Sequence, residues 1–157
     1  MKVKVKKIIS GGQTGVDRAA LYVGLELEIP IGGYCPKGRR SEDGTIPAQY
    51  PMTETDTTNY AVRTEKNVIE SDGTLVLNIG QVSSGTAYTI KMAKKHKRPY
   101  LVVQLDQLNS TVAEEIGIWL KSNQIDILNV AGPRESKNPG IYTQALELLQ
   151  EVFGGSN

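Results

Sequence analysis

The sequence predicts a three-layer α/β domain, with a mainly parallel sheet and helices on both faces. Three observations lead to this prediction: short apolar runs alternate with amphipathic stretches, glycine and proline residues separate them, and several apolar runs lead into glycine-rich loops. Strands that alternate with helices are joined by right-handed crossovers and pair in parallel. The helices then cover both faces of the sheet.

Length and composition favour a single domain over residues 1–157. A chain of this length with 39% hydrophobic residues can bury a core without disulfides, and its one cysteine, Cys35, fits a reducing compartment. The formal net charge of +1 gives no general attraction to nucleic acid or to an anionic membrane, so any anion recognition must be local. No apolar stretch approaches the roughly 20 residues of a membrane helix. We therefore expect a cytoplasmic protein with neither nucleic acid nor a membrane as its partner.

The first unit of the predicted fold joins a strand, a loop and a helix. Residues 3–9 end in a nearly continuous apolar run, which is typical of a strand buried on both faces. After a glycine-rich loop, apolar residues recur at helical spacing from residue 16 to residue 27, so one stripe of this helix can pack on the sheet. Residues 29–34 then form a short second strand, in which Gly32 and Gly33 indicate a bulge or a close approach by another group.

Residues 35–58 lack any apolar periodicity and form a loop longer than most connections inside a compact domain. Loops of this length are commonly functional or mobile. Lys37, Arg39 and Arg40 could close over an acidic ligand, and the alternative is a solvated surface loop.

The rest of the chain repeats the alternation of helix and strand. Helices are predicted over residues 59–71, 87–97 and 112–120 and from about residue 139 onwards, and strands over residues 75–79, 100–105 and 125–130. Pro139 suits the first turn of the last helix. The basic run at residues 94–98 is interpreted as a solvated helix end that complements the negative end of the dipole.

The glycine-rich loop at residues 10–17 is the first candidate site. Three glycines in five positions let a ligand approach bare backbone amides, and the following helix offers unpaired N–H groups and its positive dipole end. We expect an anion site here; the alternative is a tight turn in which Thr14 caps the helix and Asp17 complements its dipole. The candidate residues are Gly11, Gly12, Gln13, Thr14, Gly15 and Asp17.

Two later loops repeat this arrangement after other strands. Ligands of parallel α/β sheets bind outside the carboxyl ends of the strands, where the strand order reverses, and all three loops leave carboxyl ends. If the first, third and last strands are neighbours, the three loops line one crevice. The later candidate residues are Ser83, Ser84, Gly85 and Thr86 in one loop, and Gly132, Pro133, Arg134, Glu135 and Ser136 in the other.

Several common classes of protein do not fit these loops. A Walker A loop requires a lysine and a hydroxyl residue after its last glycine, but Val16 and Asp17 follow Gly15. A dinucleotide-binding fingerprint requires a glycine where Ser10 stands. One histidine and one cysteine without ligand-type spacing argue against a zinc site, and no Gly-x-Ser-x-Gly elbow is present. We therefore assign no catalytic residue and no metal ligand.

What remains is a site of backbone donors and hydroxyl groups that suits phosphate or another oxyanion. Arg134 and Arg63 are its candidate anchors, because a guanidinium pairs bidentately with phosphate and stacks on flat rings. The alternatives are a surface position on a helix for Arg63, and for Arg134 a structural ion pair with Glu135 or Asp17. Asp17, and less favourably Asp72, could accept hydrogen bonds from a ribose or a base, although acids at such positions are often caps.

Three motifs in this order resemble those of the molybdenum carrier family. They are residues 11–21, residues 60–74 with Arg63-Thr64, Asn67 and Asp72-Gly73-Thr74, and residues 131–136. This family is regarded as a circularly permuted branch of the Rossmann-like superfamily that contains Lonely Guy phosphoribohydrolases and molybdenum-cofactor carriers. The resemblance implies a Rossmann-like domain whose crevice holds a phosphate-bearing pterin, such as the molybdenum cofactor (molybdopterin), or a nucleotide.

One departure from the related enzymes favours binding over catalysis. Lonely Guy enzymes carry a Pro-Gly-Gly-x-Gly-Thr-x-x-Glu loop with a catalytic glutamate, and Thr89 stands at that position here. A hydroxyl cannot replace an ionised carboxylate in acid–base catalysis. We expect a carrier of a small phosphate-bearing ligand, and also a homo-oligomer. The alternatives are a hydrolase of a nucleotide N-glycosidic bond, with Asp17 as a substitute acid, and an oligomeric regulatory or scaffold module.

Overall fold

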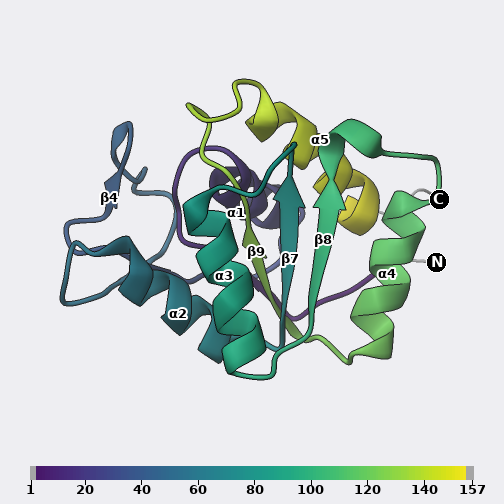
Figure 1. The fold of residues 1–157 in the computed structure, drawn as a ribbon, viewed down its shortest axis with the longest axis horizontal. Coiled ribbons are helices and arrows are strands. Elements are labelled where there is room, and N and C mark those ends of the chain that lie inside the picture. The colour runs from purple at the N-terminus through teal and green to yellow at the C-terminus, as the bar shows by residue number, and fades with distance from the viewer. Residues whose placement is uncertain (1–2, 155–157) are drawn as a thin grey trace.

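The computed structural model describes residues 3–154 and contains a central sheet of five parallel strands (Figure 1). The parallel register is continuous across the sheet, and Ile8 of the first strand pairs with Ile31 on one side and Leu128 on the other. The predicted α/β architecture with a parallel sheet is confirmed. In spatial order the strands are β2 (Ile31–Gly32), β1 (Lys7–Ile9), β9 (Ile127–Ala131), β7 (Gly73–Asn78) and β8 (Tyr100–Gln104).

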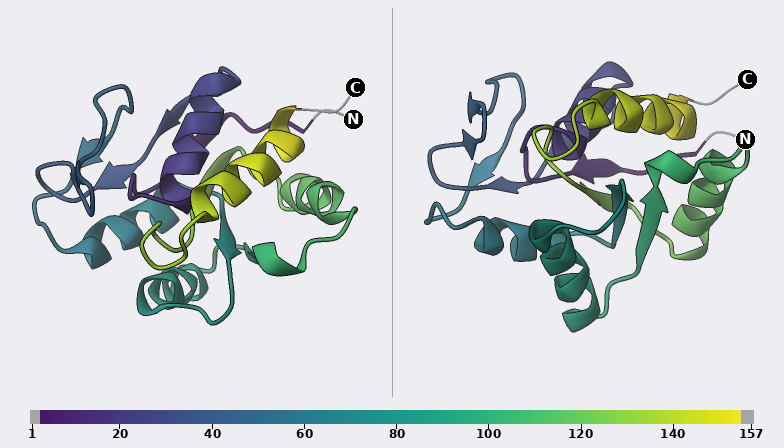
Figure 2. Two further views of the ribbon diagram at one scale, coloured as in Figure 1. Left: turned by 90° about the horizontal axis from the view of Figure 1, so that it is seen from above. Right: turned by 45° about the horizontal axis from the view of Figure 1, so that its top comes forward.

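Helices cover both faces of this sheet, which gives the three predicted layers (Figure 2). On one face α1 (Val16–Glu26), α4 (Val112–Ser122) and α5 (Ile141–Gly154) enclose the main hydrophobic core. On the other face α2 (Tyr60–Glu70) packs beside α3 (Ser84–Lys95). A short 3-10 helix, η1 (Leu105–Gln107), follows β8.

The middle of the sheet is the most deeply buried part of the chain. All six residues of β7 are buried, as its apolar sequence predicts, and Leu75 and Leu77 point into the main core. Leu128 and Val130 of β9 lie in the same core. Each such side chain contributes about 1.5–3 kcal/mol through its removal from water. The loops that follow these strands therefore start from a rigid base.

The second strand is shorter than the predicted strand over residues 29–34. It breaks at Gly33, whose φ of 126° is accessible to glycine. A β-carbon at this position would also collide with the Ser10 carbonyl oxygen. The chain therefore leaves the central sheet, and β3 (Tyr34–Cys35) pairs with β6 (Thr53–Glu54) instead.

Residues 35–58 are an ordered subdomain in place of the long irregular loop that the sequence predicts. Besides β3 and β6, they contain the hairpin of β4 (Arg40–Ser41) and β5 (Gly44–Thr45). Cys35, Ile46 and Tyr50 form a small core against Leu21 of α1. Strands of two residues are too short to show a periodic sequence pattern, which explains why the sequence does not reveal them.

Arg39, which the sequence offered as a residue that could close over a ligand, holds the backbone of this subdomain instead. Its Nη2 atom donates hydrogen bonds to the carbonyl oxygens of Ile46, Pro47 and Tyr50, at 3.3, 2.9 and 2.8 Å. Part of the basic end of α3 contacts α2 rather than solvent alone, because Lys95 and His96 both lie against Glu65. Over residues 3–154, no helix has both the length and the apolar character that a membrane crossing requires.

Candidate functional site

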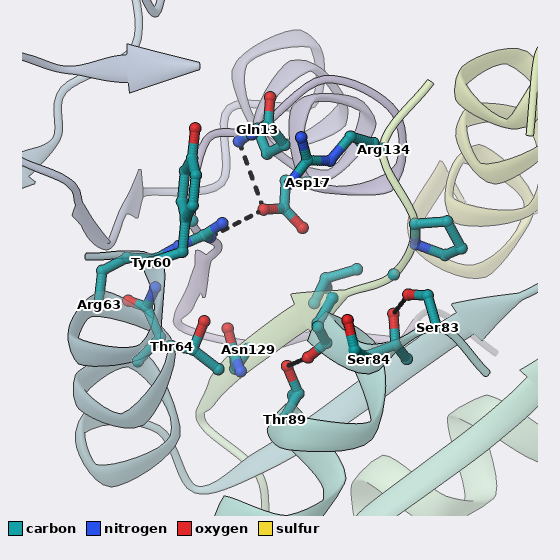
Figure 3. Close-up of a pocket in the computed structure, with 18 of the residues that line it drawn as sticks. Gln13, Asp17, Tyr60, Arg63, Thr64, Ser83, Ser84, Thr89, Asn129 and Arg134 are labelled. Carbon is teal, nitrogen blue, oxygen red and sulfur yellow. Dashed lines mark hydrogen bonds and ion pairs between the residues drawn. The ribbon is translucent and has the colours of Figure 1, made fainter. Parts of the chain in front are cut away.

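The carboxyl ends of β1, β9 and β7 are neighbours, as the sequence analysis requires for a common crevice. The loops that follow them surround a cavity of about 490 Å³ (Figure 3). The chain turns from β1 towards β2 on one side and from β7 towards β8 on the other, so the cavity lies where the strand order reverses. Of the residues predicted for the site, the lining includes Gly11, Gln13, Asp17, Arg63, Ser83, Ser84, Gly85, Thr86, Gly132, Pro133 and Arg134.

Five other predicted residues, Gly12, Thr14, Gly15, Glu135 and Ser136, are not among those that line this cavity. Two of them bind Glu42, which follows β4. The Thr14 hydroxyl donates to Glu42 Oε2, and the Ser136 hydroxyl donates to Oε1 at 2.5 Å. The Ser136 backbone N–H also donates to Oε2, at 3.1 Å. Glu42 therefore ties the first and last loops together.

Glu135 and Gly15 have structural roles where the first and last loops meet. Glu135 accepts hydrogen bonds from the backbone N–H groups of Gly140 and Tyr142, at 2.6 and 3.0 Å, and so satisfies the start of α5. Gly15 has a φ of 79°, and a β-carbon there would lie 2.5 Å from the Pro133 carbonyl oxygen. The first and last loops can approach this closely because residue 15 is glycine.

An ion pair between Asp17 and Arg63 lies against one wall of the cavity. Arg63 Nη1 donates to Asp17 Oδ2 at 3.1 Å, and the Gln13 backbone N–H donates to the same oxygen at 3.3 Å. The two side chains are only 6% and 12% exposed, respectively. Arg63 is therefore no ordinary surface residue. Figure 3 shows the second carboxylate oxygen of Asp17 turned towards the cavity.

Burial raises the pKa of the Asp17 carboxyl above its ordinary value. The charge and hydrogen bond of Arg63 and the backbone N–H of Gln13 oppose this effect without reversing it. The two ion pairs considered for Arg134 do not form, because its nearest carboxylate in the described part of the chain is that of Glu42, at 3.9 Å. This distance leaves the Arg134 guanidinium available to the cavity.

The first turn of α3 forms the opposite wall. Ser83 precedes the helix, and its hydroxyl donates to the Thr86 hydroxyl at 3.4 Å; within residues 3–154 it caps no backbone N–H group. The N–H groups of the first turn have no acceptor inside the helix. A β-carbon on Gly85 would meet no atom of the described chain within 4 Å. The glycine thus leaves open space beside these donors.

Tyr60 and Thr89 also line the cavity, although neither is predicted for the site from the sequence. The Tyr60 ring lies near the guanidinium groups of Arg40, Arg63 and Arg134. Thr89 is buried, and its hydroxyl donates to the Gly85 carbonyl oxygen at 3.2 Å. One available signal for Tyr60 was its position three residues before Arg63, on the same face of α2.

Asp72 lies at the other end of the sheet, away from the residues that line the cavity. Its Oδ2 atom accepts hydrogen bonds from the backbone N–H groups of Asp126 and Ile127, at 3.0 and 2.8 Å, where β9 begins. No group of three or more histidine, cysteine, aspartate or glutamate residues within residues 3–154 is arranged to hold a metal ion. The lining of the cavity offers hydroxyl, amide, guanidinium and ammonium groups to a ligand, together with the Asp17 carboxyl.

Comparison with protein families gives a match to the model of the circularly permutated YpsA SLOG family over residues 8–153. The chain belongs to this family. A crystal structure of a protein described as a "putative molybdenum carrier protein", from Syntrophus aciditrophicus SB, is 46% identical in sequence to this SLOG chain. It has a TM-score of 0.94 and covers 99% of this chain and 98% of its own. The resemblance stated from the three sequence motifs is confirmed.

A second solved structure, of (E)-4-hydroxy-3-methyl-but-2-enyl diphosphate reductase, is 12% identical with a TM-score of 0.39. It covers 94% of the SLOG chain and 60% of its own chain, and a likeness this low carries no argument. The comparison with curated proteins gave no match. The assignment to the SLOG family thus rests on the family model.

Proposed function

We propose that this SLOG-family protein is a carrier that binds a small phosphate-bearing molecule in the cavity at the carboxyl edge of its sheet. The observation that carries the proposal is the first turn of α3, where free backbone donors face open space beside Gly85. In this proposal Ser83, Ser84 and Thr86 surround the phosphate group. Backbone N–H groups and the positive end of a helix dipole favour an anion at such a position.

The size and charge of the cavity support a ligand of this class. A volume of about 490 Å³ lies within the range of about 300–1,000 Å³ that is common for small-molecule sites. Arg63, Arg134 and Lys137 line the cavity, and among its lining residues in the described chain Asp17 is the single acid. This excess of positive charge favours an anionic ligand over a neutral one.

Binding without hydrolysis is favoured because the two side chains that could act as the catalytic acid are unsuited to that role. The sequence resemblance to the phosphoribohydrolases matches Thr89 with their catalytic glutamate, and the Thr89 hydroxyl donates to the Gly85 carbonyl oxygen. The Asp17 carboxylate is held by Arg63 and by the Gln13 backbone. General acid–base catalysis needs a group that is positioned on the reacting atom and free to exchange its proton.

The homologue's description as a molybdenum carrier supports the molybdenum cofactor, a phosphate-bearing pterin, as the ligand. A nucleotide offers the same phosphate chemistry and is the competing ligand. In either case the residues of the α3 turn hold the phosphate, and the groups around Asp17 face the remainder of the molecule. Molybdenum itself is cargo in this proposal and needs no protein ligand.

The test is native mass spectrometry of the purified protein together with elemental analysis for molybdenum. We compare Gly85→Leu, which fills the space beside α3, with Gly154→Leu at the end of α5. Gly154 is a matched control because it is also a helical glycine whose β-carbon would meet no described atom within 4 Å. We expect a bound phosphate compound in the wild type and in Gly154→Leu, and its loss in Gly85→Leu.

Retention of the compound by folded Gly85→Leu protein would contradict the proposed phosphate position. Release of free base from nucleoside monophosphates, abolished by Asp17→Asn in a folded protein, would instead establish the hydrolase alternative. A copurified nucleotide without molybdenum or turnover would identify a nucleotide carrier. A copurified pterin with molybdenum would identify a carrier of the molybdenum cofactor.

A further inference from the structure

Three guanidinium groups gather around the ring of Tyr60, the first residue of α2. The guanidinium carbons of Arg40, Arg63 and Arg134 lie 5.4, 5.3 and 5.6 Å from the ring centroid. They come from the β4–β5 hairpin, from α2 and from the loop after β9. A single cation near an aromatic face is stabilised by about 0.5–2 kcal/mol, but three such charges also repel one another.

The carboxylates of the described chain neutralise this cluster only in part. Asp17 pairs with Arg63, whereas Glu42 lies 3.9 Å from Arg134 and already accepts hydrogen bonds from hydroxyl and amide groups. Arg40 forms no ion pair with any residue in the range 3–154. Arg63 and Arg134 line the cavity, whereas Arg40 is not among its lining residues and approaches the cluster at the Tyr60 ring. An excess of positive charge therefore remains beside this end of the cavity.

Two buried N–H donors beside the cluster lack acceptors in the described structure. They are Nε2 of Gln13, whose residue is 5% exposed, and Nε of Arg63. Both residues line the cavity. Leaving a buried polar group unpaired costs about 1–3 kcal/mol. An oxyanion bound at this end would bring acceptors to these donors, and it would also offset the repulsion among the guanidinium groups.

Tyr60 and Arg63 lie across the cavity from the first turn of α3. Figure 3 shows Tyr60 and Arg63 on one side, Ser83 and Ser84 on the other, and the open space between them. The two groups of donors therefore suit two separate anionic groups better than a single one. Arginine is well adapted to such a group, because its guanidinium binds oxyanions bidentately.

We infer that Arg40, Tyr60 and Arg134, with the free donors of Gln13 and Arg63, form a second anion subsite. The ligand class is a small molecule with an anionic group at each end, such as a nucleoside bisphosphate or a phosphorylated heterocycle with a second acidic group. The inference rests on the proposed function for the first group, which lies at α3. Tyr60 positions the guanidinium groups and, with Arg40 and Arg134, determines which ligands gain affinity from their second charge.

The test uses selenate, a small oxyanion that can bind at either group of donors without the heterocyclic part of a ligand. Crystals of the full chain are soaked in selenate, and anomalous scattering from selenium locates the bound ions. We expect one ion at the first turn of α3 and another at the arginine cluster. In solution, calorimetric titration of selenate should give two sites.

Two variants identify the residues that bind the second ion. Arg40→Met combined with Arg134→Met should lose the ion at the cluster and retain the ion at α3, so the calorimetric stoichiometry falls from two to one. Lys37→Met is the matched control, because it removes an exposed cation from the same subdomain. It should retain both ions.

The possible failures are distinguishable. Selenate at α3 alone would overturn the second subsite and leave the proposed function standing. Selenate at the cluster alone would overturn the phosphate position of the proposed function and support the second subsite. Absence of both ions would overturn both. Retention of the cluster ion by the double variant would show an adventitious ion only, and would overturn the assignment to Arg40 and Arg134.

Discussion

The guanidinium group of Arg63 occupies the space in which a β-carbon on residue 11 would stand. An alanine side chain at that position would coincide with Arg63 Nη1 and would lie 3.0 Å from Asp17 Oδ2. The φ of Gly11 is not positive, so its backbone conformation does not require glycine. The absence of a side chain is what makes room for Arg63. The Asp17–Arg63 ion pair consequently depends on a glycine in the first loop.

We predict that Gly11→Ala destabilises the protein by displacing Arg63 from Asp17. Breaking a buried ion pair at one partner typically costs about 3–5 kcal/mol, because the other charge stays buried without compensation. Urea denaturation measures the loss. Asp17→Asn in the same background should recover part of it, since the amide carries no charge. An additive double-mutant cycle would contradict the dependence of the pair on Gly11.

A second prediction concerns the pH dependence contributed by Asp17. Its folded-state pKa is raised by burial, so the folded protein keeps this proton at pH values where the unfolded chain has released it. The free energy of unfolding then falls as the pH rises from the unfolded pKa, about 3.9, through the folded pKa. Asp17→Asn should remove this component. The measurement is the difference in unfolding free energy between the two proteins across that range; a difference independent of pH would contradict the prediction.

Glu42 should give the opposite pH dependence. Burial acts to raise its pKa, but hydrogen bonds from Ser136 and Thr14 outweigh burial and lower it. Its stabilising contribution is therefore present above the unfolded pKa of about 4.3 and is lost as the pH falls through the folded pKa. We expect acidification, or Glu42→Gln at neutral pH, to accelerate amide hydrogen exchange in the β4–β5 hairpin. Unchanged exchange in Glu42→Gln would show that the hairpin is held by other contacts.

Gly85→Ala should change stability and ligand retention in opposite directions. Its β-carbon meets no described atom, and alanine in place of a helical glycine stabilises a helix by up to about 1 kcal/mol. The same methyl group occupies space beside the proposed phosphate. Thermal denaturation should therefore show a more stable protein, and mass spectrometry should show less bound ligand. A variant that is more stable and retains its full ligand would place the phosphate elsewhere.

The fold and the crevice could be predicted from the sequence because their signals are local. Each buried strand is an apolar run, and each loop that follows carries its own glycines. The neighbouring positions of the first, third and last strands were stated as a condition and are confirmed. The role of the site residues and the expected homo-oligomer stay predictions, the latter to be measured by light scattering.

Which loop residues line the cavity and which hold the loops together could not be predicted, because these roles depend on partners that are distant along the chain. Thr14 and Ser136 have the hydroxyl groups of a ligand site, yet both bind Glu42, which is 28 and 94 residues away along the chain. Tyr60 gains Arg40 as a neighbour only when the β4–β5 hairpin folds beside α2, and gains Arg134 only when the loop after β9 is in place. No periodic pattern in residues 35–58 indicates that hairpin.

The central position of β9 determines when the cavity can form during synthesis. Both β1 and β7 hydrogen-bond to β9, and their own partners β2 and β8 precede it in the chain. A nascent chain that ends before Ile127 therefore lacks the strand that joins the two pairs, as well as Gly132 and Arg134. The cavity therefore has its full lining only after β9 and the loop that follows it have been added to the chain.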